Sequence, residues 1–88
     1  MGIWLQINIM PTTQTAFQAT HTLRIASNEQ GVFRLQGDQN QTKTFGGGEY
    51  RARVEGLVVI IMSTDGRLWT KNEADIRMFS KYTLAPIK

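Results

Sequence analysis

The chain has 88 residues, ten of them basic and seven acidic, with a net charge of +3, one histidine and no cysteine. This length allows a single domain with a single small core, and the lack of cysteine excludes disulfides and thiolate metal sites. The small cationic excess favours an anionic partner without requiring one. Because the acidic residues are scattered and His21 stands alone, we expect neither a metal ion nor a cofactor.

The first predicted element is a strand over residues 3–9. Trp4, Gln6 and Asn8 alternate with four apolar residues, which are Ile3, Leu5, Ile7 and Ile9. A period of two is typical of a half-buried strand. The segment carries no Lys or Arg and is shorter than the roughly 20 apolar residues that cross a bilayer. We therefore expect no signal peptide and no membrane partner, and we predict a soluble cytoplasmic protein.

Residues 13–30 fit two patterns. As a helix they would end at Gly31 and place four apolar residues along one side, namely Ala16, Ala19, Leu23 and Ala26. As a hairpin, residues 20–26 and 32–36 would be strands joined by a turn at 27–31. Five threonines between positions 12 and 22 disfavour a helix, because β-branching restricts their side chains there. The sequence therefore favours the hairpin.

Residues 37–48, with the sequence GDQNQTKTFGGG, are predicted to form a loop, since they are rich in the residues of turns. Consecutive glycines can hold an anion through their backbone N–H groups. A nucleotide-phosphate loop, however, ends in Gly-Lys-Ser/Thr and leads into a helix. Here Lys43 precedes the glycines and a strand pattern follows them. We therefore interpret the triplet as a flexible connection between strands.

Residues 49–62 predict two strands. In EYRARVE, residues 49–55, charged residues alternate with three apolar ones, which are Tyr50, Ala52 and Val54. Gly56 ends this pattern, and residues 57–62, LVVIIM, form a run of six apolar residues. Such a run is typical of a central strand that is covered on both faces.

A hairpin and a helix complete the predicted elements. Asp65-Gly66 is a strong hairpin signal and leads into the strand RLWT. Asn72 is a suitable cap for a short C-terminal helix, since Glu73 and Asp75 fall in the first turn, where the helix dipole favours negative charge. The apolar stripe of this helix would consist of Ile76, Phe79 and Tyr82.

These elements predict a mainly β fold of five to six short strands with a short C-terminal helix. So few strands bury their faces best by closing, so we expect a small SH3-like or OB-like barrel. The alternative is an α+β fold, a curved antiparallel sheet packed by a helix at about 13–30. The run EYRARVEGLVVIIMSTDGRLW followed by NEADIRMF resembles SH3-like small barrels, in which a long buried strand, an Asp-Gly hairpin and a short helix follow in this order. The resemblance implies an architecture and carries no functional residues.

Basic residues give the first functional hypothesis, a module that binds nucleic acid. Arginines beside an exposed aromatic ring on a sheet face bind single strands, because the cations attract phosphates and the ring stacks on a base. The predicted site consists of Lys43, Arg51, Arg53, Arg67, Trp69 and Lys71. In the competing interpretation, Glu49 and Glu55 neutralise the arginines and Trp69 is a core residue.

Apolar residues give the second hypothesis, a protein-binding module. An exposed patch of Trp4, Met78, Phe79 and Tyr82 would bind a protein partner or a second copy of the chain. Such a module would be a small inhibitor or adaptor of the kind that phages and mobile elements encode, or a self-associating subunit. An acidic protein surface is the partner that the net charge favours. Neither hypothesis is enzymatic, since His21 has no carboxylate near it in sequence and no pair of acids converges.

Overall fold

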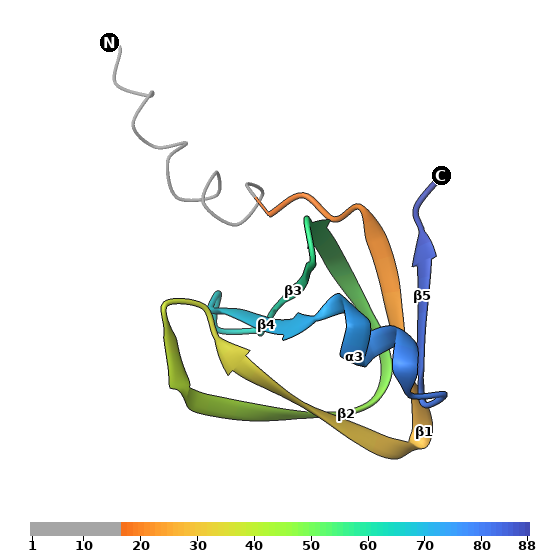
Figure 1. Cartoon of the computed structure of the whole chain (residues 1–88), viewed down its shortest axis with the longest axis horizontal. Coiled ribbons are helices and arrows are strands. Elements are labelled where there is room, and N and C mark those ends of the chain that lie inside the picture. Colours follow the sequence, from red (N-terminus) through yellow and green to blue (C-terminus); the bar gives the residue numbers. More distant parts are fainter. Residues whose placement is uncertain (1–16) are drawn as a thin grey trace, which may run out of the picture.

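The computed structural model describes residues 17–88, which form five strands and a short helix (Figure 1). The strands are β1 (His21–Leu35), β2 (Asp38–Glu55), β3 (Val58–Met62), β4 (Leu68–Asn72) and β5 (Tyr82–Pro86), and helix α3 (Glu73–Met78) lies between β4 and β5. The described part of the chain is therefore mainly β, as predicted. The strand predicted at residues 3–9 and the candidate residue Trp4 lie outside the described residues.

The strand pairings are all antiparallel and form a closed circuit. β1 pairs with β2, β2 with β3, and β3 with β4. β4 returns to β1 through two residue pairs, Arg34↔Thr70 and Leu35↔Trp69. β5 pairs with the first part of β1, outside this circuit. Closure gives each of the four strands in the circuit two neighbours, so a small sheet can enclose a core.

The hairpin predicted within residues 20–36 is wrong, because β1 runs through the predicted turn at 27–31 as one bent strand. The alternative helix at about 13–30 is wrong over residues 21–30, which are extended. The partner of both halves of β1 is β2, and the register between them shifts from Ile25 to Gln30. Such an irregularity bends a strand without ending it. The turn residues at 27–31 therefore mark a bend instead of a reversal.

The predicted loop at 37–48 is also wrong, because β2 begins at Asp38 and passes through the glycine triplet. The chain reverses at Gln36 and Gly37, directly before β2. Phe45 is buried and packs edge-to-face on Phe33 of β1, with ring centroids 5.3 Å apart. This aromatic pair fixes the first half of β2 against β1, so the polar residues around it are held in a strand.

Gly47 lets the two bent strands approach each other closely. A Cβ atom at this position would lie 2.5 Å from the carbonyl oxygen of Ala26 and 2.7 Å from the Cα atom of Ser27. Gly31 of β1 has a similar role, since a Cβ atom there would clash with the ring of Tyr82 from β5. The glycine triplet is therefore a point of close strand packing, and its interpretation as a flexible connection is corrected.

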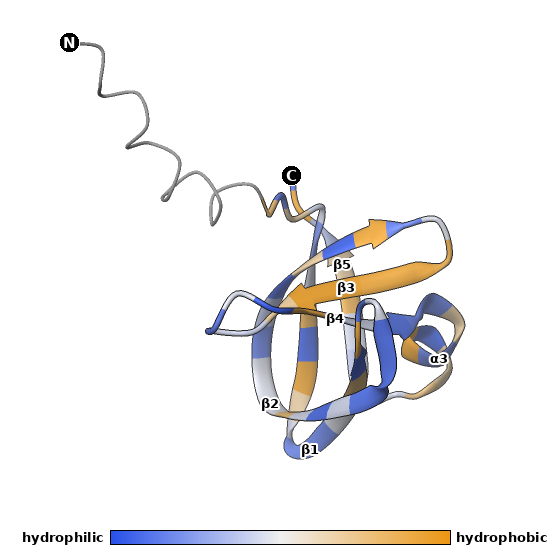
Figure 2. Cartoon of the chain, turned by 90° about the vertical axis from the view of Figure 1, so that its left-hand side faces the viewer, coloured by the Kyte–Doolittle hydropathy of each residue, from blue (hydrophilic) through white to orange (hydrophobic). Residues whose placement is uncertain are grey.

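The core lies inside the strand circuit, and β3 is its most continuously hydrophobic strand (Figure 2). Val59 and Ile61 are buried toward the core, and Ile60 is buried on the opposite face. The prediction of a central strand covered on both faces is therefore confirmed. The buried core residues are Leu23, Ile25, Phe33, Phe45, Ala52, Val59, Ile61, Trp69, Ile76 and Tyr82.

The second half of the chain follows the sequence prediction with two exceptions. Asp65 and Gly66 lie in the turn of the β3–β4 hairpin, and α3 covers the core with Ile76. Asn72 occupies the N-cap position of α3, but its side chain makes no capping hydrogen bond. The helix ends at Met78, and Tyr82 belongs to β5 instead of the helical stripe. The predicted helix is thus shorter than expected, because β1 offers its extended edge to residues 82–86.

We predict that Gly47→Ala lowers the free energy of unfolding by about 1–3 kcal/mol, since the added methyl group meets rigid backbone atoms of Ala26 and Ser27. Gly46→Ala is the matched control, because a Cβ atom at Gly46 would have no neighbour within 4 Å. The control should be neutral or stabilising by up to about 1 kcal/mol. Urea unfolding of both variants checks this, and equal stabilities would contradict the proposed packing.

Candidate functional site

Trp69, the ring predicted to stack on a base, is a core residue. Its side chain is 5% exposed and lies opposite Ile61 of β3. Its indole N–H donates a hydrogen bond of 3.0 Å to the hydroxyl of Ser63, which is itself buried. This satisfies the one polar group of a buried indole. The ring is thus inaccessible for stacking, as in the competing interpretation.

Strand register places the basic residues of the predicted nucleic-acid site on different faces of the sheet. Arg53 of β2 lies opposite Ile60 of β3, which in turn lies opposite Thr70 of β4. Lys71 lies opposite Val59, whose side chain faces the core. Residues directly opposite each other share one face of a sheet, and successive residues alternate between faces. Arg51 and Arg53 therefore lie on the outer face, and Lys71 on the inner face.

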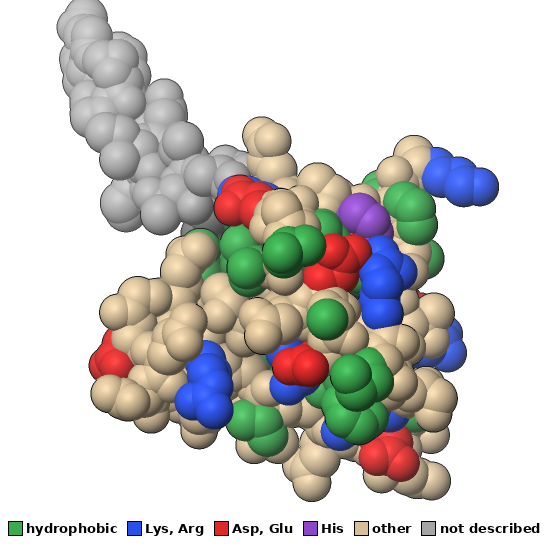
Figure 3. All heavy atoms as spheres, viewed as in Figure 1, with side chains coloured by type: hydrophobic (Ala, Val, Ile, Leu, Met, Phe, Trp, Pro, Cys, Tyr) green, Lys and Arg blue, Asp and Glu red, His purple; other side chains and the backbone are tan. Residues whose placement is uncertain are grey.

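Ion pairs occupy several of the arginines. Arg53 lies 3.1 Å from Glu55 and also donates a 3.0 Å hydrogen bond to the carbonyl of Gln18. Arg67 lies 3.6 Å from Asp65. On the face seen in Figure 3, acidic and basic side chains are interspersed and form no single basic patch. Glu55 thus neutralises Arg53, as in the competing interpretation, and Asp65 neutralises Arg67, which that interpretation did not include.

Glu49 pairs differently from the sequence expectation. It lies 3.0 Å from Arg24 of β1, in the directly opposite position, and not beside Arg51. Arg51 is exposed and forms no ion pair with the described residues. Glu49 therefore neutralises Arg24, which the predicted site did not include, and Arg51 remains exposed to solvent.

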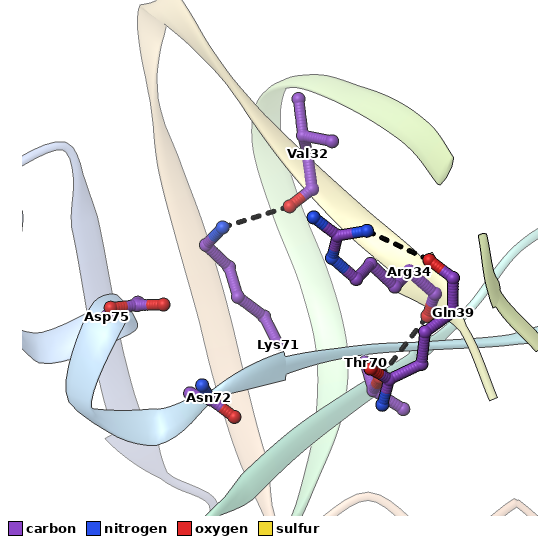
Figure 4. A pocket seen from close by; sticks show the side chains of 7 residues that line it. All are labelled: Val32, Arg34, Gln39, Thr70, Lys71, Asn72 and Asp75. Atoms are coloured by element: carbon purple, nitrogen blue, oxygen red, sulfur yellow. Dashed lines mark hydrogen bonds between the residues drawn. The ribbon is translucent and has the colours of Figure 1, made fainter. Parts of the chain in front are cut away.

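Arg34 and Lys71 line a pocket of about 280 Å³ between β1, β4 and the start of α3 (Figure 4). We call it the Arg34–Lys71 pocket. Neither cation forms an ion pair with a described residue, and both reach the pocket because β4 meets β1 at Arg34↔Thr70. The residues that line it are Val32, Arg34, Gln39, Thr70, Lys71, Asn72 and Asp75.

Hydrogen bonds to backbone carbonyls hold both cations in place. Lys71 Nζ donates to the carbonyl of Val32 over 3.0 Å, and Arg34 Nη1 donates to the carbonyl of Gln39 over 2.8 Å. The Thr70 hydroxyl donates to the carbonyl of Arg34 over 3.2 Å. Each cation keeps further N–H donors that these bonds do not use. These hydrogen bonds therefore fix the positions of the Arg34, Thr70 and Lys71 side chains that line the pocket.

Lys43 lies near the same part of the molecule as Lys71. Its ammonium is 5.7 Å from the centroid of the Phe45 ring, and the Lys71 ammonium is 5.8 Å from the centroid of the Phe33 ring. These are the two rings of the edge-to-face pair. Of the six residues in the predicted nucleic-acid site, the fold thus brings Lys43 and Lys71 to one pair of rings. Arg34, which the sequence pattern did not reveal, lines the Arg34–Lys71 pocket with Lys71, whereas Lys43 does not line it.

The residues predicted to bind a protein partner separate into exposed and buried ones. Met78 and Phe79, at the end of α3, are 68% and 50% exposed. Phe79 also lines a pocket with Glu29, Ser80 and Lys81. Tyr82 is buried against Gly31, so it offers no contact surface. Burial, together with the nearby negative charge of Asp75, raises the pKa of Tyr82.

Two further observations concern residues 17–88. No group of three or more His, Cys, Asp or Glu side chains in this range could hold a metal ion. No helix in the same range is long and apolar enough to cross a membrane. Neither a family model nor a curated protein nor a solved structure matches the chain.

We predict that Asp65→Asn destabilises the protein at neutral pH but not in acid. Hydrogen bonds from the Ser63 hydroxyl and the Arg67 N–H lower the pKa of the Asp65 carboxyl from its ordinary value of 3.8. A lowered folded-state pKa gives stability that is present above the unfolded-state pKa and lost as the pH falls through the folded-state pKa. Thermal unfolding at pH 6 and below pH 3 checks this, and a pH-independent difference between variant and parent would contradict it.

Proposed function

We propose that this chain is a cytoplasmic, non-enzymatic binding module, an SH3-like barrel that holds single-stranded nucleic acid at the Arg34–Lys71 pocket. The closed strand circuit, the Asp65-Gly66 hairpin and the short helix between β4 and β5 support the barrel assignment. The nucleic-acid assignment concerns the pocket and not Arg51, Arg53 or Arg67. It keeps Lys43 and Lys71 from the sequence hypothesis and adds Arg34.

One observation carries this proposal: two cations without an ion-pair partner among the described residues line one pocket. Four other arginines of the described chain, Arg24, Arg53, Arg67 and Arg77, are each paired with a carboxylate. Cations that form no direct ion pair can contact a phosphate group, and counterion release supplies much of the affinity for nucleic acid. Arg34 and Lys71 also present several N–H donors to an oxygen-rich ligand.

Strand β2 offers a continuation of the pocket along a nucleic-acid strand. Thr42 lies opposite Arg34 and shares its sheet face, whereas Lys43 lies opposite Phe33 on the inner face, as Lys71 does. Hydroxyl and ammonium groups of this kind bind phosphate and sugar oxygens and position the chain without reading its sequence. A single strand fits better than a duplex, because the pocket has room for one unit of the polymer and not for a helix.

We predict that Arg34→Gln combined with Lys71→Gln lowers the affinity for a short single-stranded oligonucleotide at least about tenfold at low salt. The plot of log affinity against log salt should become shallower by about 0.7 for each phosphate that the variant no longer neutralises. Arg24→Gln combined with Arg77→Gln is the matched control, since it removes the same charge from two surface ion pairs. Fluorescence anisotropy across a salt series measures both quantities.

The control variant decides whether the affinity for the oligonucleotide depends on the pocket or on the net charge of the protein. If it weakens binding as much as the pocket variant does, attraction is non-specific and the assigned site is wrong. If the unaltered protein binds neither single- nor double-stranded oligonucleotides at low salt, the proposed function itself is wrong.

A protein-binding module is the second candidate, and the exposure of Met78 and Phe79 favours it. Adjacent exposed apolar side chains on a small domain are typical of a contact surface. The module would be an inhibitor or adaptor, or a subunit of a homo-oligomer. Under this candidate, Met78→Ser with Phe79→Ser should abolish a concentration-dependent rise in mass measured by light scattering. A monomer at every concentration would exclude self-association.

A further inference from the structure

Opposite charges and unused hydrogen-bonding groups meet in the Arg34–Lys71 pocket. Asp75 of α3 lies on the side of Lys71 away from Arg34 (Figure 4). Its carboxylate forms no hydrogen bond and no ion pair with the described residues. Asn72 stands at the N-cap position, but its side chain makes no capping hydrogen bond. The backbone N–H of Glu73 donates to the carbonyl of Leu57 over 2.8 Å. One end of the pocket therefore donates hydrogen bonds, and the other end can accept them.

A phosphate ion alone does not match this arrangement, because the Asp75 carboxylate repels it. A matching ligand has an anionic group for Arg34 and Lys71 and N–H donors for Asp75. A nucleotide unit has both, on its phosphate and on its base. The pocket volume of about 280 Å³ is just below the roughly 300–1,000 Å³ of small-molecule sites, so it suits one nucleotide and not a longer segment.

We propose that the Arg34–Lys71 pocket binds one nucleotide of the strand and prefers guanine, whose base Asp75 recognises. This inference depends on the proposed nucleic-acid function and names its specificity. The base edge is accessible in a single strand, where bases are unstacked and can be read on their Watson–Crick edges.

Hydrogen-bond chemistry selects guanine among the bases. An ionised carboxylate is an acceptor at both oxygens, and the Watson–Crick edge of guanine presents two adjacent donors, N1–H and the N2 amino group. Uracil and thymine offer one ring N–H between two carbonyls, which repel a carboxylate. Adenine and cytosine place an acceptor nitrogen beside their amino group, which also repels it. The free amide of Asn72 can donate to guanine O6.

The test uses an oligouridine with one central nucleotide replaced by guanosine, inosine or adenosine. Inosine keeps the N1–H donor of guanine and lacks the N2 amino group, so it removes one of the two hydrogen bonds to Asp75. The unaltered protein should bind the guanosine oligonucleotide about five- to tenfold more tightly than either of the others, as a bidentate base contact predicts. Calorimetry or anisotropy at constant salt measures this ratio.

In the Asp75→Asn variant, the affinities for the guanosine and the adenosine oligonucleotides should become nearly equal. Its affinity for plain oligouridine should be equal or higher, because a carboxylate near the phosphate site is removed. Glu73→Gln is the matched control, since Glu73 pairs with Arg77 and does not line the pocket. This control should keep the guanosine preference.

The outcomes distinguish the inference from the proposed function. Absence of all oligonucleotide binding overturns both. Equal affinity for the guanosine, inosine and adenosine oligonucleotides leaves the function standing and overturns the guanine inference. A preference that persists in folded Asp75→Asn also overturns it, because another residue then reads the base. The inosine comparison uses the unaltered protein, so it decides the question even if the variant does not fold.

Discussion

The close approach of Gly47 to the backbone of Ala26 and Ser27 is the contact on which the rest of the fold depends. It occurs where β1 bends, between its pairing with residues 48–52 of β2 and its pairing with residues 38–46. Because both strands bend here together, the second half of β1 turns toward β4 and meets it at Arg34 and Leu35. That meeting closes the strand circuit around the core and brings the two cations of the Arg34–Lys71 pocket together.

The pocket exists because β4 pairs with β1 over only two residues before α3 begins. Within the described chain, no strand covers the edge of β1 that carries the carbonyls of Gln30 and Val32, and two lysines cover it instead. Lys71 donates to Val32 over 3.0 Å, and Lys81 donates to Gln30 over 2.7 Å. Satisfying these carbonyls holds the lysines in place, and their remaining donors are left for other partners. One local shortage of strand pairing thus explains both the position of Lys71 and the hydrogen-bond donors that it leaves unused.

Local patterns predicted the strands and the hairpin between residues 49 and 70, but they failed in the first half of the chain and missed β5. The alternation around Ala52, the apolar run through Ile60 and the Asp65-Gly66 turn are local signals, and the structure confirms all three. The bend of β1 and the strand through the glycine triplet depend on pairing between residues distant in sequence, so turn-rich composition was misleading there. For the same reason the sequence indicated Lys43 and Lys71 but not Arg34 or Asp75, which join the pocket only when β4 meets β1.

The most direct test of this account is an NMR titration of the labelled protein with a short single-stranded oligonucleotide. Amide shifts should concentrate at Val32, Thr70 and Asp75 around the Arg34–Lys71 pocket, and extend to Lys43 on β2. Arg53 and Arg67, which form ion pairs with Glu55 and Asp65, should show little change. Shifts centred on Met78 and Phe79, or no shifts at low salt, would contradict the central claim that the closure of β4 onto β1 creates the binding site.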